Sequence, residues 1–159
     1  MSDDATTTAW PDLAGRLEVV DGTRRHRLPL RVYFEDTDAG GVAYHASYVR
    51  WCERGRTDFL RLLGTDARRL IDGSDSLVPA AFVVRRMMFD FARPAMMDDV
   101  LEILTTVKDL GGASVTLNQQ VHRAGVRLCE ADVTVVLVSV SGKPLRLSDA
   151  IRSAMGTAP

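Results

Sequence analysis

A single helical pattern over residues 46–64 does more than any other feature to restrict how this chain can fold. Its apolar side chains recur every three or four residues and so form one stripe along a helix. The stripe comprises Tyr48, Trp51, Cys52, Gly55, Phe59, Leu62 and Leu63. Gly55 costs this helix about 1 kcal/mol relative to alanine, which indicates a close approach to a neighbouring backbone. Gly64 stands where a glycine commonly ends a helix, so the pattern predicts one long helix with one buried face.

The other periodic segments predict strands that cover this buried face. Apolar and polar residues alternate in the segments 15–20, 27–34, 81–91, 101–107, 114–122 and 129–137. The breaks at residues 94–99, 111–112 and 123–125 are short enough for antiparallel hairpins, and residues 148–155 predict a short helix. The sequence therefore predicts an α+β architecture, with one long helix on a curved antiparallel sheet whose free edges favour a homo-oligomer.

Length, charge and hydropathy exclude several classes of protein. A chain of 159 residues with 46% hydrophobic residues is long enough for one domain with its own core. Its 20 Lys and Arg balance 21 Asp and Glu, which gives no reason to expect nucleic acid as a partner. The most apolar run, residues 133–140, is far shorter than the ~20 residues of a membrane helix, and residues 1–15 contain no secretion signal. We expect a cytoplasmic domain over residues 16–155, preceded by a flexible extension over residues 1–15, with no integral membrane association.

The densest group of chemically useful residues lies between the strand at 27–34 and the long helix. Asp38 lies on a loop with two glycines, seven residues before His45 at the start of the helix. A carboxylate that attacks or activates water, together with backbone N–H donors for an oxyanion, is what acyl transfer requires. A thioester is already an activated electrophile, so this chemistry needs no metal. Asp36 has a simpler predicted role, as a carboxylate that stabilises the N-terminus of the helix.

Residues 31–48, RVYFEDTDAGGVAYHASY, resemble the active-site signature of the 4-hydroxybenzoyl-CoA thioesterase family of hot-dog proteins. The likeness continues through residues 51–60, 82–86 and 98–103, and it is closest to the branch of acyl-CoA thioesterases associated with the Tol-Pal system. Ala43 departs from the Val or Phe that is usual in the family, which affects the shape of the pocket. The resemblance implies a hot-dog fold, in which an antiparallel sheet wraps a long central helix and dimers form edge to edge, often pairing into tetramers.

The resemblance also implies roles for individual residues. Asp38 corresponds to the catalytic carboxylate, which acts as nucleophile or general base, and His45 to a second active-site residue. The backbone N–H groups of Gly41, Tyr44 and His45 correspond to donors near the thioester carbonyl. The family's sites usually lie at a dimer interface and use no metal or prosthetic group, because coenzyme A is part of the substrate. We therefore expect a hydrolase that converts an acyl-CoA thioester to a free acid and coenzyme A.

The nucleotide end of coenzyme A carries phosphates, which need cationic or hydroxyl donors at the protein surface. Arg85, Arg86, Lys143 and Arg146 are the candidate cations, since they lie in regions that resemble those the family uses. Ser114, which follows a pair of glycines, is a candidate hydroxyl donor.

Two other functions remain compatible with the sequence. The acyl carrier could be a protein, which would make this an acyl-carrier-protein thioesterase with a basic patch beside its pocket. The domain could also bind acyl-CoA without hydrolysing it, although such a module would not need Asp38 and His45. Glu53 is a further candidate, because another hot-dog branch carries its catalytic glutamate on the central helix. Its position between Arg50 and Arg54 favours a structural ion-paired role.

The remaining histidines and cysteines predict no chemistry. His26 and His122 are isolated on predicted polar faces of strands. Cys52 lies on the buried stripe and should pack as a small hydrophobic residue. Cys52 and Cys129 lie far apart in sequence and lack the spacing of a zinc site, so neither a metal centre nor a disulfide is expected.

Overall fold

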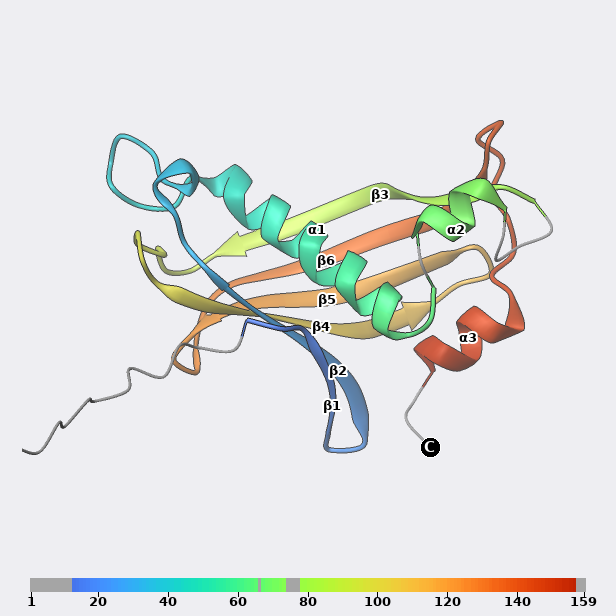
Figure 1. The fold of residues 1–159 in the computed structure, drawn as a ribbon, viewed down its shortest axis with the longest axis horizontal. Coiled ribbons are helices and arrows are strands. Elements are labelled where there is room, and N and C mark those ends of the chain that lie inside the picture. Colours follow the sequence, from blue (N-terminus) through green and yellow to red (C-terminus); the bar gives the residue numbers. More distant parts are fainter. Residues whose placement is uncertain (1–12, 66, 74–77, 157–159) are drawn as a thin grey trace, which may run out of the picture.

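The computed structural model describes residues 13–65, 67–73 and 78–156, in which one long helix lies across a face of an antiparallel sheet (Figure 1). The strands are β1 (Arg16–Val20), β2 (Thr23–Arg31), β3 (Ala80–Phe91), β4 (Val100–Leu110), β5 (Ser114–Arg123) and β6 (Val126–Ser139). The helices are α1 (His45–Leu62), α2 (Ala67–Asp72) and α3 (Asp149–Met155), with one 3-10 turn, η1, at Phe34–Asp36. The strand order is β1-β2-β4-β5-β6-β3 and all neighbours are antiparallel, so the predicted α+β architecture is confirmed.

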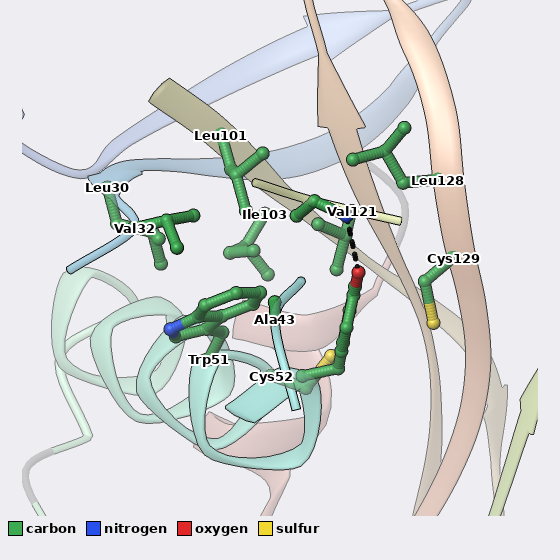
Figure 2. Packing of buried hydrophobic residues seen from close by; sticks show 12 residues of the cluster. Leu30, Val32, Ala43, Trp51, Cys52, Leu101, Ile103, Val121, Leu128 and Cys129 are labelled. Carbon is green, nitrogen blue, oxygen red and sulfur yellow. Dashed lines mark hydrogen bonds between the residues drawn. The ribbon is translucent and has the colours of Figure 1, made fainter. Parts of the chain in front are cut away.

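The apolar stripe of α1 packs on the sheet largely as predicted. Trp51 and Cys52 are almost fully buried and face Ile103 of β4 (Figure 2). A Cβ atom on Gly55 would lie 2.9 Å from Ile103 Cγ2, so the glycine does permit a close approach of helix and sheet. The stripe ends earlier than predicted, because Leu62 is 43% exposed.

Alternation along the central strands separates an apolar face of the sheet from a polar one. The inward residues of β5 and β6 are buried, and they include the polar Gln119, which is fully buried against α1. On the outer face, Lys108 pairs with Asp132, and Thr116 and Thr134 form a cross-strand hydrogen bond of 2.9 Å. The helix therefore covers one face only, and side-chain pairs occupy the other.

One predicted connection is wrong. Residues 94–99 do not close a hairpin, because β3 pairs with β6 at the edge of the sheet while β4 pairs with β2 and β5. The segment instead crosses from the edge strand to the middle of the sheet, and the hydrogen bond from Ala92 N to Leu128 O (2.9 Å) fixes its start. The breaks at 111–112 and 123–125 do form the β4–β5 and β5–β6 hairpins.

Other boundaries differ in smaller ways. The strand predicted at 27–34 occupies Thr23–Arg31, and Phe34 leaves the sheet for η1, where it is 81% exposed. The helix α2 has no counterpart in the sequence-based prediction. The predicted C-terminal helix is confirmed, and Ser148 Oγ accepts a 3.2 Å hydrogen bond from Ile151 N. Most of the predicted extension, residues 1–12, lies outside the described residues. Within the described residues, no helix has the length and hydropathy needed to cross a membrane.

The strand β3 forms a long edge of the sheet and exposes apolar side chains. Among the described strands it pairs with β6 alone, and it has a bulge at Arg85. Its exposed apolar residues are Val83, Val84, Met87, Met88 and Phe91. A twelve-residue edge of this kind is an unpaired template in a single chain.

Candidate active site

The loop between β2 and α1 is held to the start of α1 by Asp36. Its carboxylate is buried and its Oδ2 accepts a 2.8 Å hydrogen bond from Tyr33 N. Its backbone oxygen accepts hydrogen bonds of 2.8 Å from both Tyr44 N and Ser47 Oγ. The carboxylate was predicted to stabilise the helix N-terminus. It contacts α1 through an ion pair of 3.8 Å between its Oδ1 and Arg50 Nη2, while its hydrogen bond goes to Tyr33 and the backbone oxygen holds the first turn of the helix.

Asp38 begins a tight turn in the same loop. Asp38 Oδ1 accepts a 2.8 Å hydrogen bond from Gly40 N, and Asp38 O accepts one of 3.0 Å from Gly41 N. Gly41 has φ +77°, a left-handed conformation that glycine adopts without strain. The side chain of Asp38 is exposed, and it forms no salt bridge with any described residue.

The turn and the start of α1 bring Asp38 and His45 to one hollow of about 300 Å³. It is lined by Asp38, Ala43, His45, Tyr48, Phe91, Ala92, Arg93 and Pro94. Its walls are aromatic, because the ring centroid of Phe91 lies 6.5 Å from that of His45 and 5.4 Å from that of Tyr48. The hollow is open on one side and has apolar walls, so it can receive an acyl group next to the carboxylate of Asp38, a potential nucleophile.

Of the three predicted backbone donors, the structure leaves one unoccupied. Gly41 N donates to Asp38 O at 3.0 Å and Tyr44 N donates to Asp36 O at 2.8 Å, so both are used within the loop. His45 is the first residue of α1, and its N–H has no hydrogen-bond partner among the described residues. The first N–H groups of a helix point outward and carry the positive end of its dipole, which suits an oxyanion.

A buried hydrogen bond holds the opposite wall of the hollow, which sequence analysis did not identify. Tyr48 Oη accepts a 2.9 Å hydrogen bond from Ala95 N, and Ala95 O accepts one of 2.8 Å from Ala43 N. Tyr48 is buried and still borders the hollow, so it serves both as core and as wall, and burial raises the pKa of its hydroxyl. Arg123 Nη1 secures the same segment through a 2.6 Å contact with Asp99 Oδ2. The one sequence feature that marked this segment was the break at residues 94–99, which contains Pro94.

The candidate residues for coenzyme A lie away from this hollow within one chain. Arg85 and Arg86 are exposed in the middle of β3. Ser114, Lys143 and Arg146 lie at the far end of the sheet, where Ala80 pairs with Ser139, and Arg146 borders a larger hollow of about 540 Å³. The 18 residues of α1 separate the two ends by about 27 Å, at about 1.5 Å per residue. One chain therefore brings Asp38 and His45 together without the candidate phosphate-binding residues.

Comparison with known proteins identifies the family of this chain. Residues 40–130 match the model of the thioesterase superfamily. The chain belongs to that superfamily. The acyl-CoA thioester hydrolase YbgC of Escherichia coli O6:H1 is 43% identical over 131 residues, which cover 81% of this chain and 94% of that protein. The acyl-CoA thioesterase YbgC of Haemophilus influenzae is 37% identical over 128 residues, covering 80% of this chain and 91% of that protein.

Solved structures of the superfamily confirm the hot-dog fold. The crystal structure of a probable thioesterase from Bartonella henselae is 40% identical and superposes with a TM-score of 0.75, covering 78% of this chain and 99% of that one. The expected fold, a long central helix wrapped by an antiparallel sheet, is the fold observed here (Figure 1).

The remaining sequence candidates of this thioesterase-superfamily chain lie outside the hollow. The prediction for His26 was wrong in its location, because His26 is fully buried and its Nε2 lies 2.7 Å from Asp58 Oδ2. Glu53 is exposed, and its Oε1 accepts a 2.6 Å hydrogen bond from Thr57 Oγ1 and not from a neighbouring arginine. His122 Nε2 contacts Gln120 Oε1 at 2.8 Å. Cys52 is buried as predicted, and burial raises the pKa of its thiol to about 12. Among the described residues no group of His, Cys, Asp and Glu is arranged to hold a metal ion.

Proposed function

We propose that this protein is an acyl-CoA thioesterase, which hydrolyses an acyl-CoA to a free acid and coenzyme A. The observation that carries the proposal is the convergence of Asp38 and His45 on one aromatic-walled hollow at the N-terminus of α1. Relatives named acyl-CoA thioester hydrolases match this chain over nearly their whole length, which supports the same reaction class. We further propose that the enzyme is cytoplasmic, uses no metal or prosthetic group, and is associated with the Tol-Pal system like the branch it resembles.

Asp38 is the proposed catalyst, and two routes fit its position. As a nucleophile, its carboxylate oxygen attacks the thioester carbonyl carbon, the C–S bond breaks, and coenzyme A leaves as a thiolate that takes up a proton. Water then cleaves the resulting anhydride to the free acid. As a general base, Asp38 instead takes a proton from the water that attacks the same carbon. The free N–H of His45 stabilises the oxyanion on either route, at about 2.7–4 kcal/mol for one such donor.

The β3 edge supports a homodimer that completes this site. An antiparallel pairing of two β3 edges about a two-fold axis would cover the exposed residues Val84, Met87 and Phe91. It would also bring the Ala80 end of one copy beside the Phe91 end of the other. Because Lys143 and Arg146 lie near the Ala80 end, the cations of one copy would approach the catalytic hollow of the other. Two such dimers could pair into the proposed tetramer.

The deciding experiment measures coenzyme A release from short aliphatic, long aliphatic and aromatic acyl-CoAs with a thiol-trapping reagent. We expect Asp38→Asn to lower kcat by orders of magnitude while the fold and the oligomeric state are kept. Glu35→Gln is the matched control, since Glu35 is an exposed carboxylate in the same loop that does not line the hollow, and it should retain wild-type turnover.

The outcomes separate the competing functions. Unchanged turnover in Asp38→Asn would refute the assignment of the catalyst. His45→Ala should cost less than Asp38→Asn, and a larger loss would mean that the two roles are reversed. Acyl-CoA binding without turnover would favour a binding module. Hydrolysis of an acyl group from acyl carrier protein, but not from coenzyme A, would favour the carrier-protein thioesterase.

A further inference from the structure

Arg56, in the second half of α1, is a largely buried cation that makes one long hydrogen bond within the described residues. It is 9% exposed, although it does not belong to the apolar stripe of α1. Its one hydrogen bond among the described residues is a long contact of 3.4 Å from Nη1 to Gln119 Oε1, and no described carboxylate lies within salt-bridge distance. A guanidinium has five N–H donors, and the buried side-chain nitrogen or oxygen without a partner in the described part of the chain is His26 Nδ1 and no atom of Arg56, so the unbonded donors of Arg56 are open to water or a ligand. The residue is therefore poised to accept an anionic partner.

The guanidinium borders a hollow of about 300 Å³ that shares no residue with the catalytic one. This second hollow lies among α1, α2, β3 and β6, and most of its walls are apolar. The apolar walls include Leu60, Leu70, Ile71, Phe82 and Val84. At ~30 Å³ for each water-sized group, it has room for about ten non-hydrogen atoms.

Two polar side chains stand beside Arg56 in the second hollow. Glu53 is exposed, so water screens its charge, and its Oε1 is already bonded to Thr57 Oγ1 at 2.6 Å. The charge of Arg56 acts from a buried position and is screened less. The second hollow therefore suits a ligand with an apolar chain that ends in a carboxylate. The negative charge of Glu53 lowers the affinity for such a ligand.

We propose that the second hollow binds a carboxylic acid with an aliphatic body of about ten non-hydrogen atoms, held by a charge-assisted hydrogen bond from Arg56. The same chemistry is found in a free fatty acid and in the distal carboxylate of a dicarboxylic acyl group. Val84 at the rim of the second hollow belongs to the β3 edge that the proposed dimer covers, so the site is tested on the assembled protein. The site does not depend on the thioesterase proposal.

Isothermal titration calorimetry with octanoate, octan-1-ol and octanedioyl-CoA tests this site. We expect saturable octanoate binding that is at least roughly tenfold tighter than that of octan-1-ol, because a hydrogen bond to a charged group contributes about that factor. Arg56→Met should weaken octanoate binding roughly tenfold, whereas Arg54→Met, the same change at an exposed arginine of α1, should leave it unchanged. Glu53→Gln should tighten it roughly threefold, since one opposing exposed charge is removed.

Asp38→Asn distinguishes octanoate binding in the second hollow from product binding in the catalytic hollow. This variant should still bind octanoate, and the binding should still depend on Arg56. Binding of octanedioyl-CoA that depends on Arg56 would identify the distal carboxylate as the source, and octanoate binding alone the free acid. Equal binding of octanoate and octan-1-ol, or unchanged binding in Arg56→Met, would overturn the proposal. If Arg56→Met does not fold by circular dichroism, Glu53→Gln decides, and an affinity no tighter than wild type would refute it.

Discussion

Removing one hydroxyl, by Tyr48→Phe, tests how the wall of the catalytic hollow is held. Tyr48 Oη is the hydrogen-bond acceptor for Ala95 N at 2.9 Å, and both residues are buried. Phenylalanine keeps the ring and its contacts with Trp51 and Phe91, whose centroids lie 5.0 and 5.4 Å away. The substitution therefore leaves a buried N–H without a partner and changes little else.

The expected cost follows from that single unsatisfied group. A buried donor that loses its partner costs about 1–3 kcal/mol of stability. For a chain of this length, 1 kcal/mol lowers Tm by about 2–4 °C, so Tyr48→Phe should lower Tm by about 2–12 °C. Because Pro94 and Ala92 border the hollow, we also expect KM for an acyl-CoA to rise more than kcat falls.

Thermal unfolding followed by circular dichroism, at one fixed protein concentration, measures the effect. Tyr44→Phe is the matched control, because Tyr44 is about half exposed and its hydroxyl has no hydrogen bond among the described residues. Its stability should stay within about 0.5 kcal/mol of wild type. The reasoning fails if Tyr48→Phe unfolds at the wild-type temperature, or if both variants lose the same stability.

Three further predictions concern other parts of the core. Gly55→Ala gains about 1 kcal/mol of helix propensity but places a Cβ 2.9 Å from Ile103 Cγ2, so denaturant unfolding should show a net loss of stability. Burial lowers the pKa of His26 below its usual 6.5, so the unfolded chain takes up the proton first and stability should fall as pH drops through that value. Urea titrations between about pH 7.5 and about pH 5.5 should show this loss in wild type and a smaller one in His26→Gln, and equal slopes would contradict it. Burial raises the pKa of Cys52 and Cys129 to about 12, so the thiol-trapping reagent should react with neither until the protein is unfolded, and rapid labelling of the native protein would contradict this.

The parts of the site that sequence analysis identified are local in the chain. Asp38 and His45 are seven residues apart, and a turn followed by a helix start keeps such residues close in any fold. The spacing of apolar residues likewise determined α1, because a helix with one buried stripe leaves few alternatives. Gly55 was informative because a close approach explains its cost in helix propensity, and the structure places Ile103 Cγ2 2.9 Å from where its Cβ would lie.

The features that sequence analysis missed depend on contacts between distant segments. A short break with a proline reads alike whether the chain turns back or crosses the sheet, so the position of residues 94–99 could not be inferred. His26 alternates correctly with polar neighbours, yet its partner Asp58 lies on α1 and buries it. Arg56 is likewise buried where α1 packs on the sheet, next to Gln119 of β5. In the proposed dimer, the relation between Asp38 and the candidate phosphate-binding residues would depend on a second chain, whose position one sequence does not give.

The two edges of the sheet differ in a way that limits how far these molecules can associate. The β3 edge has twelve residues, whereas β1 has five and carries Arg16 and Glu18, which makes it a poor template for another strand. A two-fold contact through β3 uses the same edge in both copies, so no second β3 edge is left to extend the row. In the proposed dimer the sheet would therefore grow by one addition and then stop, which would protect the protein against polymerisation into fibres. Any larger assembly must then form through a face of the molecule and not through an edge.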